Sequence, residues 1–160
     1  MTRYNDGRER ALSTAEYRAL AQFRYHIRRF LRFSEKAARE SGLETQQYQL
    51  MLAIKAEPAP PTVGEIAERM QIQHHSGVEL VNRCEQNGLV KRTPSDFDRR
   101  KVYLDLTPEG ERLLKKLARH HRAALSTMAP MMLQALEQIS KKVKRRARRK
   151  SHQSRTARAE

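Results

Sequence analysis

The sequence predicts a mainly α-helical fold with one small β-hairpin, and three observations lead to this prediction. Charged residues make up 32% of the 160 residues while glycine and proline contribute six each, a composition that suits a helical domain. Capping sequences followed by apolar residues at three- and four-residue steps recur along most of the chain. Between residues 89 and 106 the period changes to alternation, which is typical of β-strands. The length favours one compact unit over two large domains.

Basic residues dominate the charge of the chain. Thirty-three Lys and Arg against 18 Asp and Glu give a formal net charge of +15, which indicates a polyanionic partner such as nucleic acid or an anionic membrane surface. Residues 141–160 hold ten of the Lys and Arg residues and one Glu, so a balance of +9 lies in this segment and +6 in residues 1–140.

We expect a cytoplasmic protein without a membrane span. Cys84 is the single cysteine and cannot form an intramolecular disulfide, which fits a reducing compartment. Residues 1–10 are charged and lack the apolar core of a secretory signal. Apolar runs such as residues 50–54 fall far short of the roughly 20 residues that a membrane-spanning helix needs.

Two helices are predicted in the first third of the chain. Ser13-Thr14-Ala15-Glu16 is a capping box that begins a long helix, and Ser41-Gly42 ends it. A second helix starts near Thr45 and is expected to bury Tyr48, Leu52 and Met51. The proline-rich segment 57–61 stops this helix because proline cannot continue the hydrogen-bond ladder.

The next two helices form a helix-turn-helix candidate. Thr62-Val63-Gly64-Glu65 is a second capping box, which opens a helix of about two turns through Met70. After a break at residues 71–72, a further helix runs from about Gln73 to Gln86 and ends at Asn87-Gly88. Its inward residues are Leu80, Val81 and Cys84.

A hairpin follows, with strands over residues 89–93 and 101–106 and a polar turn between them. Val102, Leu104 and Leu106 are expected to face the core. Four basic residues are expected to cluster at the tip, where like charges need a compensating anion: Arg92, Arg99, Arg100 and Lys101. This hairpin is a candidate wing.

Two helices complete the predicted fold. Thr107-Pro108-Glu109 begins one of them, with proline at its first position, and Pro130 separates it from a final helix. Together with the long first helix they carry more apolar surface than the winged module can cover, which predicts a second copy of the chain as partner. From Lys144 onward no apolar residue exceeds alanine in size, and disorder is expected.

These boundaries divide the chain into five expected segments. The outer ones are a flexible N-terminus (1–12) and a basic disordered tail (144–160). Between them we expect an N-terminal dimerisation helix (13–44), a winged helix-turn-helix region (45–107) and C-terminal dimerisation helices (108–143).

The order of elements and the residues of the hairpin resemble the MarR family of bacterial transcription regulators over roughly residues 13–145. The motifs that carry the resemblance are residues 87–90 (Asn-Gly-Leu-Val), 98–100 (Asp-Arg-Arg) and 104–110 (Leu-Asp-Leu-Thr-Pro-Glu-Gly). The resemblance implies a homodimer in which each winged helix binds one half of a near-palindromic operator, most simply as a repressor. The segment 73–77 departs from the common Ser/Thr-rich version, so the operator sequence is not inferred.

The second helix of a helix-turn-helix inserts its N-terminal part into the major groove, where base edges are distinguishable. The predicted readers there are Gln73, His74, His75, Ser76 and Glu79, with Arg83 at phosphates. The alternative is that these side chains are merely solvated on an exposed helix.

In the wing, the resemblance assigns Arg100 to a narrow minor groove, whose negative potential attracts arginine. Asp98 lies two residues earlier on a strand-like path, so it can orient the Arg100 guanidinium, with Arg99 and Lys101 beside them. The alternative is an exposed ion pair worth about 0–1 kcal/mol.

Sensing of a ligand is less specified. The resemblance implies a small aromatic or phenolic anion as effector. The aromatic residues of the first two helices are expected to be mainly core residues, so no pocket residue is assigned. Cys84 is an alternative oxidant sensor, although a buried thiol is inert. No cofactor or metal is expected, because the adjacent pairs His74-His75 and His120-His121 diverge on a helix.

Three classes of function compete. A sequence-specific regulator accounts for the whole pattern, while a nonspecific or architectural nucleic-acid-binding protein accounts for the basic tail alone. An enzyme is not expected, because the sequence has no nucleophile–base pair, glycine-rich phosphate loop or paired-carboxylate motif.

Overall fold

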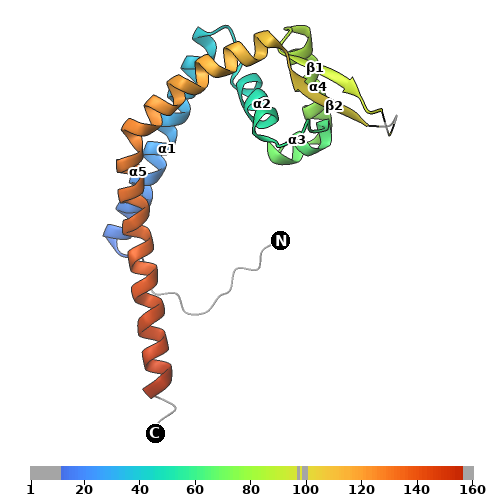
Figure 1. The fold of residues 1–160 in the computed structure, drawn as a ribbon. Coiled ribbons are helices and arrows are strands. Elements are labelled where there is room, and N and C mark those ends of the chain that lie inside the picture. Colours follow the sequence, from blue (N-terminus) through green and yellow to red (C-terminus); the bar gives the residue numbers. More distant parts are fainter. Residues whose placement is uncertain (1–11, 97, 99–100, 157–160) are drawn as a thin grey trace. The chain divides into compact units, whose positions relative to one another are not determined.

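The computed structural model describes residues 12–96, 98 and 101–156, with side chains described up to residue 140. Within these residues the fold is mainly α-helical with one two-stranded antiparallel hairpin, as the sequence predicts (Figure 1). No helix in the described part is both long enough and apolar enough to cross a bilayer. The elements in chain order are α1 (Thr14–Glu40), α2 (Thr45–Ala56), α3 (Val63–Arg69), α4 (His74–Gln86), β1 (Val90–Pro94), β2 (Val102–Leu106) and α5 (Pro108–Thr156).

The chain forms two compact units rather than the single one expected from its length. Unit 1 comprises residues 1–30 and 125–160, and unit 2 comprises residues 31–124. Both long helices, α1 and α5, contribute to both units, so the division follows packing and not the ends of the elements.

Unit 2 holds a continuous hydrophobic core. Helix α2 supplies Leu50, Met51 and Ile54, each at most 5% exposed, together with Tyr48. The prediction that Leu52 faces inward is wrong, since its exposed fraction is 44%. The residues at 47, 50, 51 and 54 define the buried stripe of α2, and position 52 lies outside it.

Three helices end within unit 2 in the same motif. A residue with positive φ follows the helix, and the backbone N–H of the next residue donates a hydrogen bond to a carbonyl in the last turn. The residues with positive φ are Gly42 (φ 76°), Gln71 (φ 56°) and Gly88 (φ 66°). After each, the following amide donates to a carbonyl five residues earlier, for example Leu89 N to Cys84 O at 2.9 Å. Glycine adopts this conformation without steric cost, whereas Gln71 does not.

The hairpin is anchored to the chain that precedes α3. Leu104 N donates to Pro61 O at 2.8 Å, and Thr62 forms an isolated bridge with Tyr103. Leu104 is fully buried and Leu106 is 9% exposed, while Val102 is half-buried, so the predicted inward face of β2 is mainly confirmed. β1 begins at Val90, one residue later than expected.

The start of α5 is fixed against the end of α4. Thr107 N donates to Leu89 O at 3.0 Å, and Thr107 Oγ1 donates to Gly88 O at 2.6 Å while accepting from Gly110 N at 3.0 Å. A Cβ on Gly110 would lie 2.1 Å from Leu89 O, so only glycine fits there. These contacts give a physical reason for the sequence Thr107-Pro108-Glu109-Gly110.

Two predictions about the C-terminal part are wrong. Pro130 lies inside α5 and does not separate two helices. Proline removes one N–H donor from the ladder, but the alanine, leucine and methionine residues on both sides favour helix. The expected disorder from Lys144 is also not found over residues 144–156, where the backbone of α5 continues through a segment that is rich in lysine and arginine and has no glycine or proline. Residues 157–160 of the expected tail lie outside the described residues. The expected flexible N-terminus lies, apart from residue 12, outside the described residues.

Candidate nucleic-acid interface

Helices α3 and α4 form the predicted helix-turn-helix within unit 2. The capping box at the start of α3 is confirmed, because Thr62 N donates to Glu65 Oε2 at 2.7 Å and Glu65 N donates to Thr62 Oγ1 at 3.4 Å. The backbone N–H of Thr62 is the main cause of the lowered pKa of Glu65. Gly77 lets the two helices approach, since a Cβ there would lie 3.0 Å from the Cβ of Ala67.

The predicted readers lie at the start of α4. Gln73 is the N-cap residue, and its side chain and those of His74, His75 and Glu79 are exposed, while Ser76 is half-buried. The N-terminal part of α4 is therefore free of contacts that would bury these four side chains within unit 2.

An exposed stripe runs along α4 on the face opposite its buried residues. It consists of His75, Glu79, Asn82 and Gln86, at steps of four, three and four residues, and all four side chains are exposed. The sequence analysis omitted Asn82 and Gln86, although the same helical spacing from Glu79 would have found them. This stripe of α4 is called the reading stripe below.

Arg83 does not belong to the reading stripe. Its Nε lies 3.6 Å from Glu44 Oε2, beside the N-terminus of α2, and its side chain is 43% exposed. The carboxylate of Glu44 partly neutralises the guanidinium, so its role at phosphates stays a prediction.

The structure corrects the expected position of Arg92. It pairs with Leu104 in the middle of the hairpin, and two further residue pairs lie between it and the turn. Its guanidinium contacts two residues of α4, through an ion pair with Glu85 and a hydrogen bond of 2.7 Å to Asn82 Oδ1. Arg92 is therefore no tip residue, because its side chain joins β1 to α4.

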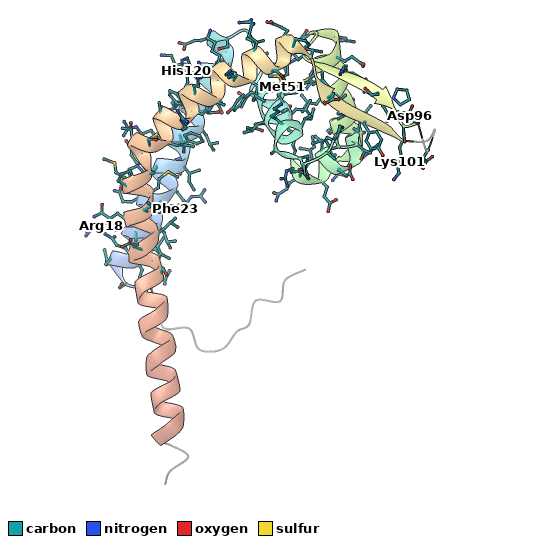
Figure 2. All side chains as sticks on the ribbon, viewed as in Figure 1. Arg18, Phe23, Met51, Asp96, Lys101 and His120 are labelled. Atoms are coloured by element: carbon teal, nitrogen blue, oxygen red, sulfur yellow. The ribbon has the colours of Figure 1, made fainter. Side chains whose placement is uncertain are left out.

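Of the remaining predicted wing residues, Lys101 lies at the free end of the hairpin, close to Asp96 (Figure 2). Lys101 is exposed, its N–H donates to Asp98 O at 2.9 Å, and its carbonyl accepts from Ser95 N at 3.0 Å. Asp98 N donates to Ser95 Oγ at 3.2 Å. Arg99 and Arg100 lie outside the described residues, so the orientation of Arg100 by Asp98 stays a prediction.

Cys84 lies in the core and not at the interface. Its side chain is fully buried, and this burial raises the pKa of the thiol from 9.0 to about 12. Because the thiolate is the reactive form, the environment opposes oxidation of Cys84 at neutral pH.

Some of the aromatic residues considered for an effector site are core residues, as expected. Tyr48 is 4% exposed and stacks on the buried ring of His121 with a centroid distance of 4.4 Å, and Phe33 meets the same ring edge-on at 5.7 Å. His121 Nε2 lies 2.8 Å from Ser34 Oγ and Nδ1 lies 2.8 Å from Leu117 O. Among the described residues no group of His, Cys, Asp or Glu is placed to hold a metal ion.

Comparison with protein families identifies the winged region. Residues 41–101 match the model of the MarR family, a range that covers the helix-turn-helix and strand β1 but ends before β2. The chain is 33% identical over 67 residues to the uncharacterized HTH-type transcriptional regulator YsmB of Bacillus subtilis, a match to 42% of this chain and 46% of YsmB. It is 43% identical over 49 residues to the HTH-type transcriptional repressor MdtR of Bacillus subtilis, a match to 31% of this chain and 32% of MdtR. The chain thus covers half or less of these relatives.

Solved structures share the fold over most of the chain. AbsC, a MarR family transcriptional regulator from Streptomyces coelicolor, superposes with a TM-score of 0.67 at 23% identity, covering 88% of this chain and 99% of AbsC. A mutant of MepR from S. aureus, bound to an oligodeoxyribonucleotide, has a TM-score of 0.56 at 17% identity, with coverages of 88% and 96%. CouR from Rhodococcus jostii RHA1 bound to p-coumaroyl-CoA has a TM-score of 0.62 at 24% identity, with coverages of 79% and 95%.

Proposed function

We propose, from the premise that residues 41–101 form a MarR family domain, that this protein is a sequence-specific, DNA-binding transcriptional regulator of the cytoplasm. The matched relatives named above are transcriptional regulators and not enzymes. The protein acts by binding double-stranded DNA, and it catalyses no reaction.

The reading stripe of α4 carries this proposal. A helix that buries Leu80, Val81 and Cys84 against unit 2 and exposes His75 and Glu79 on the opposite face has the shape that a major groove accepts. The exposed groups are chemically suited to base edges, because glutamine and asparagine pair with adenine and a glutamate accepts from the cytosine amino group.

The wing supplies the second contact. Arg100 enters the minor groove beside the stretch of major groove that the reading stripe contacts. Asp98 orients its guanidinium, and Arg99 and Lys101 contact the flanking phosphates. The resemblance to the MarR family supports this role for Arg100, and the exposed position of Lys101 at the free end of the hairpin fits it.

The protein acts as a homodimer on a near-palindromic operator. Among the side chains of unit 1 that the structure describes, eight large apolar ones are exposed in the single chain: Leu12, Tyr17, Leu20, Tyr25, Leu125, Met131, Leu133 and Leu136. If a second copy of the chain covers these side chains, the same surface of both chains forms the interface. Such a dimer has two-fold symmetry, and so does the DNA site that it binds. Light scattering is expected to give about twice 18.7 kDa, and a monomer at micromolar concentration would contradict this assembly.

We assign repression, and release by a small aromatic or phenolic anion, to this dimer by analogy. MdtR is named a repressor, and CouR was crystallised with p-coumaroyl-CoA. A thermal-shift screen of aromatic acids tests the effector: a compound that stabilises the protein and lowers operator affinity is expected. If no aromatic acid does so and operator binding is also unaffected by oxidants, the result favours a regulator controlled only by its own abundance.

The basic segment 144–160 adds affinity without sequence preference. Its balance of +7 neutralises phosphates, each of which contributes about −0.9 to the slope of log K against log salt. Truncation after Val143 is expected to reduce the slope by several units while the preferred sequence stays the same. An unchanged slope would mean that the segment does not contact DNA.

A duplex competition assay separates this function from that of a nonspecific architectural protein. The full chain is incubated with a duplex that it has selected from genomic fragments, together with excess random duplex. A specific regulator stays on the selected duplex, whereas an architectural protein is displaced in proportion to the competitor. An unselective protein would overturn the proposal.

A further inference from the structure

Arg92 makes contacts that its expected role in the wing does not explain. Its guanidinium reaches from β1 to α4, where Nη1 donates to Glu85 Oε2 and Nη2 donates to Asn82 Oδ1 at 2.7 Å. The side chain is only 26% exposed, although the residues beside it in β1 are exposed. Arg92 thus bridges the wing and the helix that carries the reading stripe.

The bridge determines how the amide of Asn82 is oriented. A guanidinium has only hydrogen-bond donors, so the group of Asn82 that faces it must be the acceptor oxygen Oδ1. The Nδ2 amide group of Asn82, which carries two N–H donors, is therefore not used by Arg92. Asn82 is exposed and lies on the same stripe as His75 and Glu79, about 12 Å along the helix from His74.

The bridge also affects the charge of Arg92. Glu85 forms an ion pair with the guanidinium at the surface of α4, so the pair contributes little net charge toward DNA. A free arginine at this place would act mainly as a phosphate contact, which carries no sequence information. The paired one is better suited to hold another residue in place.

We propose that Arg92 is a positioning residue, which together with Glu85 holds Asn82 so that its Nδ2 donates to an acceptor on a base edge in the major groove. The candidate acceptors are the O6 and N7 of guanine, the N7 of adenine and the O4 of thymine. This assignment rests on the proposed DNA-binding function and adds Asn82 as a specificity-determining residue, with Arg92 acting through it.

The test compares three variants of the full chain on two probes. The probes are the duplex that the wild-type protein selects from a random-sequence pool and a random duplex of equal length. Arg92→Lys keeps the charge but replaces the two separate donors Nη1 and Nη2 with a single nitrogen, and Glu85→Ala removes the anchoring carboxylate. Asn82→Ala removes the donor itself.

All three variants are expected to lower the ratio of selected to random affinity by at least about fivefold, the smallest discrimination that one good base contact gives. Arg92→Lys is expected to leave the salt slope within about 0.9 of wild type, because no phosphate contact is lost. A repeated selection with Asn82→Ala is expected to lose preference at one base-pair position of each half-site. Thermal unfolding of each variant is recorded to show that the chain still folds.

Simple electrostatics predicts a different pattern. Removal of the Glu85 carboxylate from a DNA-binding face would then raise the affinity for both duplexes, and Arg92→Lys would have no effect. Either result would overturn the positioning role, as would an equal loss of affinity for both duplexes in Asn82→Ala. If the wild-type protein selects no sequence, the proposed function itself fails, which is a distinguishable outcome.

Arg112→Lys and Glu109→Ala are the matched controls. Arg112 Nε donates to Glu109 Oε2 at 2.8 Å at the start of α5, an exposed arginine–glutamate pair within the same unit but away from the reading stripe. These substitutions are expected to leave the affinity ratio and the selected sequence unchanged. If they lower the ratio as Arg92→Lys does, the effect is general and the assignment to Arg92 is wrong.

Discussion

The two units of this protein distribute their apolar residues in opposite ways. Unit 2 gathers 17 buried residues in one hydrophobic cluster, all between residues 37 and 117. Among the residues with described side chains, unit 1 buries four, namely Ala19, His26, Met128 and Ala135, and exposes eight large apolar ones. Unit 2 therefore has a core of its own, whereas unit 1 does not.

This difference indicates which part of the molecule depends on assembly. Each fully buried leucine contributes about 1.5–3 kcal/mol relative to an exposed one, so the exposed leucines of unit 1 represent several kcal/mol that a partner could recover. The reading stripe and the hairpin lie on the self-sufficient unit. We infer that the DNA-binding module folds through its own packing, and that the parts of α1 and α5 in unit 1 become stable chiefly when two chains meet.

Gly110→Ala is expected to have the largest effect on stability, because it adds a side chain at a position of unit 2 where none fits. The new Cβ would lie 2.1 Å from Leu89 O, so either the backbone after α4 or the start of α5 must move. We expect a loss of about 3 kcal/mol or more in the free energy of unfolding. Chemical denaturation of the full chain measures it.

Gly64→Ala is the matched control for this prediction. The atoms nearest to a Cβ there are 4.0 Å away, and alanine favours helix by up to about 1 kcal/mol. We expect it to be neutral or stabilising. If the two variants had equal stability, the close approach of Gly110 to Leu89 would not limit the fold.

Leu133→Glu tests the other side of the comparison. Leu133 lies in unit 1 and is 58% exposed in the single chain, so a charge there would be buried when a partner covers it. We expect the dimer to weaken by about 2 kcal/mol, which sedimentation measures as a dissociation constant raised roughly thirtyfold.

Leu52→Glu serves as the control, since Leu52 is 44% exposed but belongs to unit 2. It is expected to leave the assembly unchanged. Equal weakening by both variants would show that the interface is not confined to unit 1.

Gln71→Gly has the smallest expected effect and sharpens the account of unit 2. Gln71 adopts φ 56° at the end of α3, where Gly42 and Gly88 end other helices in the same way. Relief of the left-handed strain outweighs the greater freedom that glycine gives the unfolded chain, so stability should rise by about 0.5 kcal/mol. Thermal unfolding tests the direction, and a lower melting temperature would contradict it.

Local signals predicted the elements of unit 2 well. The capping box at Thr62, the stop at Gly88 and the start at Pro108 depend on residues within a few positions of each other, and the structure confirms all three as element boundaries. The sequence did not show whether the helix propensity of a long segment outweighs a single proline within it. Pro130 suggested a break, but the residues around it favour helix strongly enough to continue α5.

Tertiary contacts explain what local patterns could not predict. The bridge from Arg92 depends on Glu85 and Asn82, which lie on another element, and the pairing with Leu104 rather than the sequence distance determines where Arg92 sits. Leu52 was misplaced because its spacing from Tyr48 fits a helix face equally well, and only the packing of α2 shows that the neighbouring positions 50, 51 and 54 are the buried ones.

Selection of DNA by the full chain tests the central claim most directly. In the proposed dimer, each of the two copies of unit 2 should present one reading stripe to the same duplex. A random-sequence pool is therefore expected to yield two inverted copies of one short motif about 10–10.5 base pairs apart, bound by two chains per duplex. Recovery of no enriched sequence, or of a single unrepeated motif bound by one chain, would contradict the claim.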